Sequence, residues 1–121
     1  MANLISLKTF TDTRGNLTVI EKILPFQIKR IFYIYGVDNS ERGGHRHHIT
    51  LQGAICIQGR CTIYSYNGAK KDIFELDAPD KCLILKPTDW HKMYNFSKNA
   101  ILMVLASEEF SKNDYIFEPY E

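Results

Sequence analysis

Short runs of β-branched and aromatic residues, separated by Gly, Asn, Asp and Pro, recur along the whole chain. Turn signals every roughly 8–12 residues are typical of all-β domains, and no stretch shows a convincing helical period. We therefore predict short strands assembled into a sandwich or barrel. The predicted strands are Ile5–Phe10, Leu17–Ile23, Gln27–Tyr35, Gln52–Gln58, Arg60–Tyr66, Lys71–Leu76, Cys82–Lys86, His91–Phe96 and Ala100–Ala106.

Two turns between these strands are marked by glycine. Gly59 separates two apolar runs, and Asn67 with Gly68 tolerates the positive φ of a tight hairpin. Both turns predict antiparallel neighbours. The stretch 107–121 is acidic and aromatic, and it predicts a short helical or irregular tail.

Length and charge restrict the class of protein. The chain has 121 residues, with 15 Lys and Arg against 14 Asp and Glu. This length fits one domain, residues 1–121. The balanced charge creates no large field of one sign, so nucleic acid and anionic membranes are not favoured as partners.

The cysteines and the N-terminus bear on the compartment. Cys56, Cys61 and Cys82 lie in apolar stretches without CxxC or metal-ligand spacing, which predicts buried free thiols suited to a reducing cytoplasm. The first residues lack the basic start and apolar stretch of a signal peptide. No apolar run approaches the roughly 18 residues of a membrane span. We therefore expect a soluble, cytoplasmic protein.

The most informative stretch is Arg42–His48, which holds three of the four histidines. Side chains two apart on a strand share a face, so His45 and His47 are predicted to point into one site. Arg46 and His48 are predicted to face away.

Three interpretations of these histidines are open. They could form a solvated polar loop or a metal site, or act as an acid–base pair, since an imidazole takes and gives protons near neutral pH. Metal-binding cupins follow HxH with a glutamate and a later histidine. Here Gln52 stands near the glutamate position and His91 at the later one. A neutral amide is a poorer ligand for a divalent cation than a carboxylate.

Tyrosines on the preceding strand are candidates for proton transfer. Tyr33 and Tyr35 share one face of that strand, opposite Phe32 and Ile34. Tyr33 is the better candidate for a proton shuttle, and the alternative for each tyrosine is an ordinary half-buried barrel residue.

Basic and aromatic residues are candidates for holding a phosphorylated ligand. A guanidinium recognises a diphosphate in a forked geometry, which makes Arg14 and Arg42 candidates, with Lys29 or Arg30 as further cations. The alternative for Arg14 is a plain surface charge. Trp90, the only tryptophan, precedes the fourth histidine and could stack on a base or sugar, or simply plug the barrel end.

Several motifs together resemble one enzyme family over almost the whole chain. It is similar to the cupin-fold dTDP-4-oxo-6-deoxyglucose 3,4-ketoisomerases, which supply precursors of aminated deoxysugars for bacterial surface glycans. The matching segments are residues 12–15 (DTRG), 25–34 (PFQIKRIFYI), 42–47 (RGGHRH), 87–91 (PTDWH), 104–107 (VLAS) and 114–116 (DYI).

The resemblance implies a fold and a set of catalytic residues. The fold is a small cupin, a jelly-roll barrel of antiparallel strands with a short C-terminal tail. His45 and His47 fall on the family's two active-site histidines, with His47 as the base and Tyr33 as a proton relay. Arg46 departs from the small residue usual at its position, and we expect it to alter packing or an interface. No metal and no cofactor are implied.

The resemblance also implies a substrate and a partner. The substrate would be a dTDP-linked 4-oxo-6-deoxyhexose, with the galacto product preferred over the gluco product. The partner would be a second copy, in a homodimer whose N-terminal strand crosses to the neighbour and brings Arg14 to the neighbour's site. The substrate-binding residues would be Arg14, Lys29, Arg42, Trp90 and His91.

Three rival functions have distinct signatures. A nucleotide-sugar epimerase of similar fold would return the proton to the carbon that lost it. A metal-dependent cupin oxygenase or isomerase would contain metal when purified. A non-catalytic sugar-binding cupin would keep its affinity when His47 is replaced.

Overall fold

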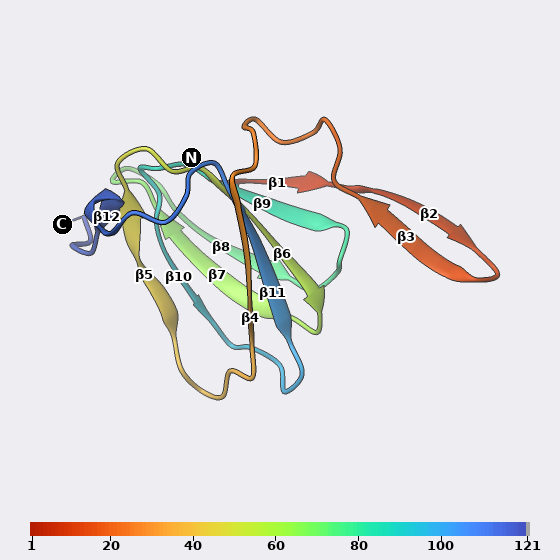
Figure 1. Cartoon of the computed structure of the whole chain (residues 1–121). Helices are drawn as coiled ribbons and strands as arrows, with labels where there is room; N and C mark the ends of the chain where they lie inside the picture. Colours follow the sequence, from red (N-terminus) through yellow and green to blue (C-terminus); the bar gives the residue numbers. More distant parts are fainter. Residues whose placement is uncertain (121) are drawn as a thin grey trace.

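Two five-stranded antiparallel sheets form a barrel, from which a two-stranded ribbon projects (Figure 1). The computed structural model describes residues 1–120, and the sheet orders are β1-β9-β6-β11-β4 and β12-β5-β10-β7-β8. This confirms the all-β, antiparallel class. The elements are β1 Asn3–Ser6, β2 Lys8–Asp12, β3 Gly15–Val19, β4 Arg30–Tyr35, β5 Arg42–His47, β6 Gln52–Gln58, β7 Cys61–Tyr66, β8 Lys71–Leu76, β9 Lys81–Leu85, β10 Trp90–Tyr94, β11 Ile101–Ala106, the 3₁₀ helix η1 Lys112–Asp114 and β12 Tyr115–Ile116.

The main core lies between the two sheets. Leu83 and Leu102 of the first sheet and Ile63 of the second belong to one buried apolar cluster. A second cluster covers the other face of the first sheet, where Ile55 packs with side chains from the segment that follows β3, such as Leu24. The first sheet is therefore partly buried on both faces, which explains its nearly continuous apolar strands.

Strand alternation predicted most elements, and the errors have physical reasons. Gln52–Gln58 and Lys71–Leu76 match β6 and β8. The predicted strand Ile5–Phe10 is wrong, because Leu7 is buried in the second cluster and its N–H bonds the carbonyl of Asp80. Its two halves are β1 and β2.

The tail and the histidine stretch are more regular than predicted. Arg42–His47 forms a complete strand, β5, paired with β10. The tail contains the predicted helical turn, η1, but also β12, which pairs with Arg46 and His47. Glu121 lies outside the described residues.

The two predicted turns connect different kinds of neighbours. Gly68, at φ +94°, lies between β7 and β8, which pair antiparallel as predicted. The prediction for Gly59 is wrong, because β6 belongs to the first sheet and β7 to the second. Gly59 turns the chain at φ +72° from one sheet to the other.

The ribbon β2–β3 extends away from the barrel (Figure 1). All five residues of β2 are exposed, and Phe10 and Leu17 leave more than half of their surface in solvent. An exposed two-stranded ribbon with apolar side chains is marginal by itself in water.

The three cysteines are buried and free of disulfides, as predicted. Among residues 1–120, no helix is long and apolar enough to cross a membrane.

Gly59→Ala is expected to destabilise the fold more than Gly36→Ala, although both glycines have nearly the same φ, +72° and +71°. A Cβ at position 59 would overlap Ser97 Oγ and lie 2.9 Å from Ala100 Cα, whereas nothing lies within 4 Å at position 36. We expect Gly36→Ala to lose about 1 kcal/mol and Gly59→Ala roughly 2–4 kcal/mol. Urea unfolding measures both, and equal losses would contradict this packing.

Candidate active site

Three histidines form a compact cluster inside one end of the barrel. The ring centroid of His45 lies 4.9 Å from His47 and 4.9 Å from His91, and the last two are 6.3 Å apart. His45 and His91 are register partners on β5 and β10, and His47 follows two positions later on β5. The predicted convergence of His45 and His47 is thus present, with His91 as a third member, while His48 is exposed.

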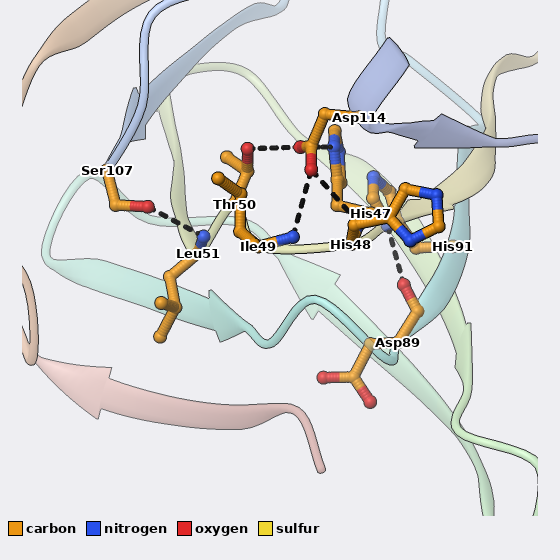
Figure 2. A network of polar contacts seen from close by, with 9 residues as sticks. All are labelled: His47, His48, Ile49, Thr50, Leu51, Asp89, His91, Ser107 and Asp114. Carbon is orange, nitrogen blue, oxygen red and sulfur yellow. Dashed lines mark hydrogen bonds and ion pairs between the residues drawn. The ribbon is translucent and has the colours of Figure 1, made fainter. Parts of the chain in front are cut away.

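A single carboxylate holds the end of β5 (Figure 2). Asp114 Oδ2 lies 2.9 Å from His47 Nδ1 and also accepts the Thr50 hydroxyl. Asp114 Oδ1 accepts the backbone N–H groups of His48 at 3.1 Å and Ile49 at 2.9 Å. An ionised carboxylate only accepts, so Nδ1 of His47 carries the proton and Nε2 presents a lone pair.

The surroundings hold these groups in defined charge states. Burial lowers the pKa of His91 to about 3 and of His45 to about 4, and neighbouring histidines add to both shifts. Burial also lowers the pKa of His47, while Asp114 opposes that shift. Burial raises the pKa of Asp114, but hydrogen bonds from Thr50, Ile49 and His47 outweigh it, and the net pKa is lowered. At neutral pH the site therefore contains neutral imidazoles backed by one carboxylate.

Two of the imidazoles have a buried nitrogen without a partner. His91 Nδ1 bonds the backbone carbonyl of Asp89 at 3.0 Å (Figure 2). Nε2 of both His47 and His91 has no hydrogen-bond partner among the described residues. Gln52, 3% exposed, has an unpartnered Oε1 as well. Residues 1–120 contain no group of three His, Cys, Asp or Glu side chains arranged to hold a metal ion.

The C-terminal segment forms an aromatic wall over the cluster. The ring centroid of Tyr115 lies 4.6 Å from that of His45 and 4.7 Å from that of His47, and Phe117 lies 6.1 Å from His45. Trp90 Nε1 donates to the carbonyl of Phe117 at 3.1 Å. The rings of Tyr115 and Phe117 therefore border the histidines, and Trp90 holds the backbone of this segment.

Arg46, on the other face of β5, holds the C-terminal segment in place through Tyr120. Its Nη1 donates to the Tyr120 hydroxyl at 3.0 Å, and its guanidinium lies 4.1 Å from the centroid of that ring. The Tyr120 hydroxyl in turn donates to the carbonyl of Thr88 at 2.8 Å. Arg46 thus packs within its own chain, away from the histidines.

Other candidate residues from the sequence lie elsewhere in this chain. Tyr33 is 62% exposed on the face of β4 opposite the core, so the prediction that it lies beside the histidines is wrong for its own subunit. The strand alternation was correct, but the phenol face is the outer one. Arg14 occupies the tip of the ribbon and pairs with Asp12 at 2.6 Å. Arg42 begins β5, at the end opposite His47.

Lys29 lies outside the histidine cluster. Its Nζ pairs with Glu108 at 3.5 Å. It lines a cavity of about 410 Å³ whose lining includes Asp114 but none of the histidines. Of the predicted binding residues, His91 belongs to the cluster, and Trp90 contacts the cluster's surroundings through the backbone of Phe117.

Asp114 and Tyr115 are the site residues that reasoning from the sequence missed. Asp114 is 67 residues from His47 in the chain, so no local period connects them. The only signal was the motif at residues 114–116, which carried the resemblance without showing a role.

The whole chain, residues 1–121, matches the family model FdtA, described as WxcM-like, C-terminal. A curated relative, the TDP-4-oxo-6-deoxy-alpha-D-glucose-3,4-oxoisomerase of Aneurinibacillus thermoaerophilus, is 38% identical over 93% of this chain and 83% of its own.

Solved structures agree with this match. A His-to-Asn variant of the 3,4-ketoisomerase QdtA from Thermoanaerobacterium thermosaccharolyticum, in complex with TDP-4-keto-6-deoxyglucose, is 38% identical with a TM-score of 0.92, over 97% of this chain and 87% of that one. The TDP-quinovose 3,4-ketoisomerase WlaRB and the TDP-fucose-3,4-ketoisomerase WlaRA, both from Campylobacter jejuni, are 36% and 35% identical. Their TM-scores are 0.93 and 0.90, over 97% of this chain and 92% and 89% of theirs.

Asp114→Asn is expected to lower the pKa of His47 further, because the amide removes the negative charge that favours the imidazolium. NMR titration of the histidine ring signals measures this pKa. The control is Asp77→Asn, which removes a surface carboxylate paired with Lys81 and should leave the pKa of His47 unchanged. An unchanged or higher pKa in Asp114→Asn would show that Asp114 does not act on His47 electrostatically.

Proposed function

The chain belongs to the FdtA family of sugar nucleotide 3,4-ketoisomerases, and on this basis we propose that it isomerises TDP-4-keto-6-deoxyglucose to the 3-keto sugar. The observation that carries the proposal is the paired His47 and Asp114, with a free Nε2 inside a buried cluster of neutral imidazoles. Such a pair is suited to removing a proton next to a carbonyl.

The reaction needs one base and one proton relay. The C4 carbonyl acidifies the C3 proton, and His47 Nε2 removes it while O4 gains a proton, which gives the enediol. His47 then returns its proton to C4, and O3 loses its proton as the carbonyl forms at C3. Asp114 stabilises the imidazolium between the two steps. The net change is an internal redox exchange that consumes no co-reactant.

The relay between O3 and O4 is assigned to groups that border His47. His45 is neutral at physiological pH and partly buried, so it can both donate and accept a hydrogen bond. Tyr115 places a phenol ring beside both histidines and takes the role first expected of Tyr33. Each such group contributes roughly 10²–10⁴ in rate when correctly positioned.

We assign the galacto configuration to the product. In the gluco substrate, H3 lies on one face of the ring, and a proton added to C4 on that same face gives the galacto isomer. A single base that serves both carbons therefore predicts galacto, whereas gluco requires an acid on the opposite face. The three histidines form one cluster, which favours a single face. Relatives named for TDP-quinovose and for TDP-fucose are almost equally similar to the chain.

The site is proposed to be completed by a second copy of the chain. The ribbon β2–β3 leaves the barrel with Phe10 and Leu17 exposed, as expected of a segment that packs on a partner. Arg14, at its tip, would then reach the diphosphate in the partner's site. Tyr33 and Tyr35, stacked and exposed on β4, offer a further apolar contact. The free thiols suit a cytoplasmic enzyme.

The purified, chelator-treated protein is expected to convert TDP-4-keto-6-deoxyglucose in deuterated buffer to a 3-keto sugar, with C4 in the galacto configuration. Proton NMR resolves the carbonyl position, the configuration and any solvent deuterium at C4. His47→Asn should lose turnover by roughly 10²–10⁴-fold, while His48→Asn, its exposed neighbour, should keep it.

Other outcomes of this experiment identify the rivals. Exchange at C3 or C5 without carbonyl migration would show an epimerase, and no exchange would show a binding protein or a wrong substrate. Turnover only after metal is restored would show a metal-dependent cupin. A gluco product would overturn only the assignment that one base acts on a single face of the sugar ring, and the ketoisomerase function would stand.

Two inactive variants are expected to regain activity when their subunits mix and form heterodimers. In a heterodimer of one Arg14→Ala and one His47→Asn subunit, both substitutions fall in the same site, and the other site is intact. Half of the dimers in an exchanged equal mixture are heterodimers, so the mixture should recover about a quarter of wild-type activity. Ultracentrifugation gives the oligomeric state, and native mass spectrometry of the mixture shows whether heterodimers have formed. A monomer, or a mixture that exchanges without recovery, would contradict the shared site.

A further inference from the structure

Gln52 places a buried amide inside the barrel. It is the first residue of β6 and is 3% exposed. Ala54 and Cys56, which share its face of the strand by alternation, lie in the core between the two sheets. Ile55, on the other face, belongs to the cluster outside the first sheet. The carboxamide of Gln52 therefore belongs to the interior.

This amide is unfavourable for stability as it stands. Oε1 of Gln52 has no hydrogen-bond partner among the described residues. A buried, unsatisfied polar group costs about 1–3 kcal/mol, and a methionine of similar size would remove that cost. A group that lowers stability in a core is commonly kept for function.

The amide lies at the same end of the barrel as the histidines. Gln52 pairs with Leu85 at the end of β9, and the backbone N–H of His47 donates to the carbonyl of Pro87, two residues further along. Two buried imidazole nitrogens at this end, Nε2 of His47 and Nε2 of His91, also have no partner among the described residues. The interior end of the barrel thus holds an amide oxygen and two imidazole nitrogens without partners among residues 1–120.

We propose that Gln52 binds the hexose ring, with its carboxamide hydrogen-bonded to an oxygen of the carbons that react. The proposal rests on the proposed function and adds a substrate-binding residue to it. An amide both donates and accepts, so it can follow an oxygen that changes between carbonyl, hydroxyl and enediolate. A carboxylate at this position would repel the negative charge that develops on that oxygen, which explains a neutral side chain here.

Gln52→Met tests the proposal, with Gln58→Met as the matched control. Gln58 lies at the other end of the same strand, where it is exposed and its Nε2 donates to the carbonyl of Asn99 at 2.7 Å. We expect Gln52→Met to lower kcat/KM for the keto sugar roughly 10–10³-fold. Its melting temperature should be equal or higher, and Gln58→Met should keep wild-type kcat/KM.

Calorimetry with TDP alone separates a sugar contact from a general defect. TDP lacks the hexose, so Gln52→Met should bind it with wild-type affinity. An unchanged kcat/KM in Gln52→Met would overturn the proposal. A parallel loss of TDP affinity and melting temperature would overturn it as well. That result would mean that the amide binds a buried water or stabilises the fold. Turnover by the wild type is measured first, and its absence would refute the proposed function instead.

Discussion

The carboxylate of Asp114 connects three parts of the molecule on which the site depends. It comes from the short helix that precedes β12, and it accepts hydrogen bonds from the end of β5 and from the turn that leads to β6. Because the same contacts fix the ring of His47 and the path of the chain toward Gln52, the geometry of the candidate site and the end of the barrel are set together. The C-terminal segment is thus part of the candidate site, and Arg46 holds it in place through Tyr120.

Two opposing effects act on the pKa of His47 in this arrangement. Burial among other histidines disfavours the imidazolium, and the ionised carboxylate favours it. His45 and His91 lack a carboxylate partner among the described residues, and their pKa values fall to about 4 and about 3. For the proposed reaction, this contrast makes His47 the group suited to gain and lose a proton, and His45 and His91 neutral hydrogen-bonding groups.

The sequence predicted what depends on local rules. Alternation placed His45 and His47 together and separated Tyr33 from the apolar side of β4, but it could not tell which face was the interior. Glycine marked the turn at Gly59 without revealing that the chain changes sheets there, because each strand chooses its partners over long distances. Asp114 was missed for the same reason, since its contact with His47 joins segments that only tertiary structure brings together.

The pH dependence of kcat/KM reports whether His47, backed by Asp114, is the base. The base must be unprotonated, so activity falls as the pH drops through its pKa. We expect Asp114→Asn to lower the plateau and to shift this acid limb to lower pH, because the imidazolium has lost its counter-charge. An acid limb at the same pH in wild type and Asp114→Asn would contradict it and assign the base to another group.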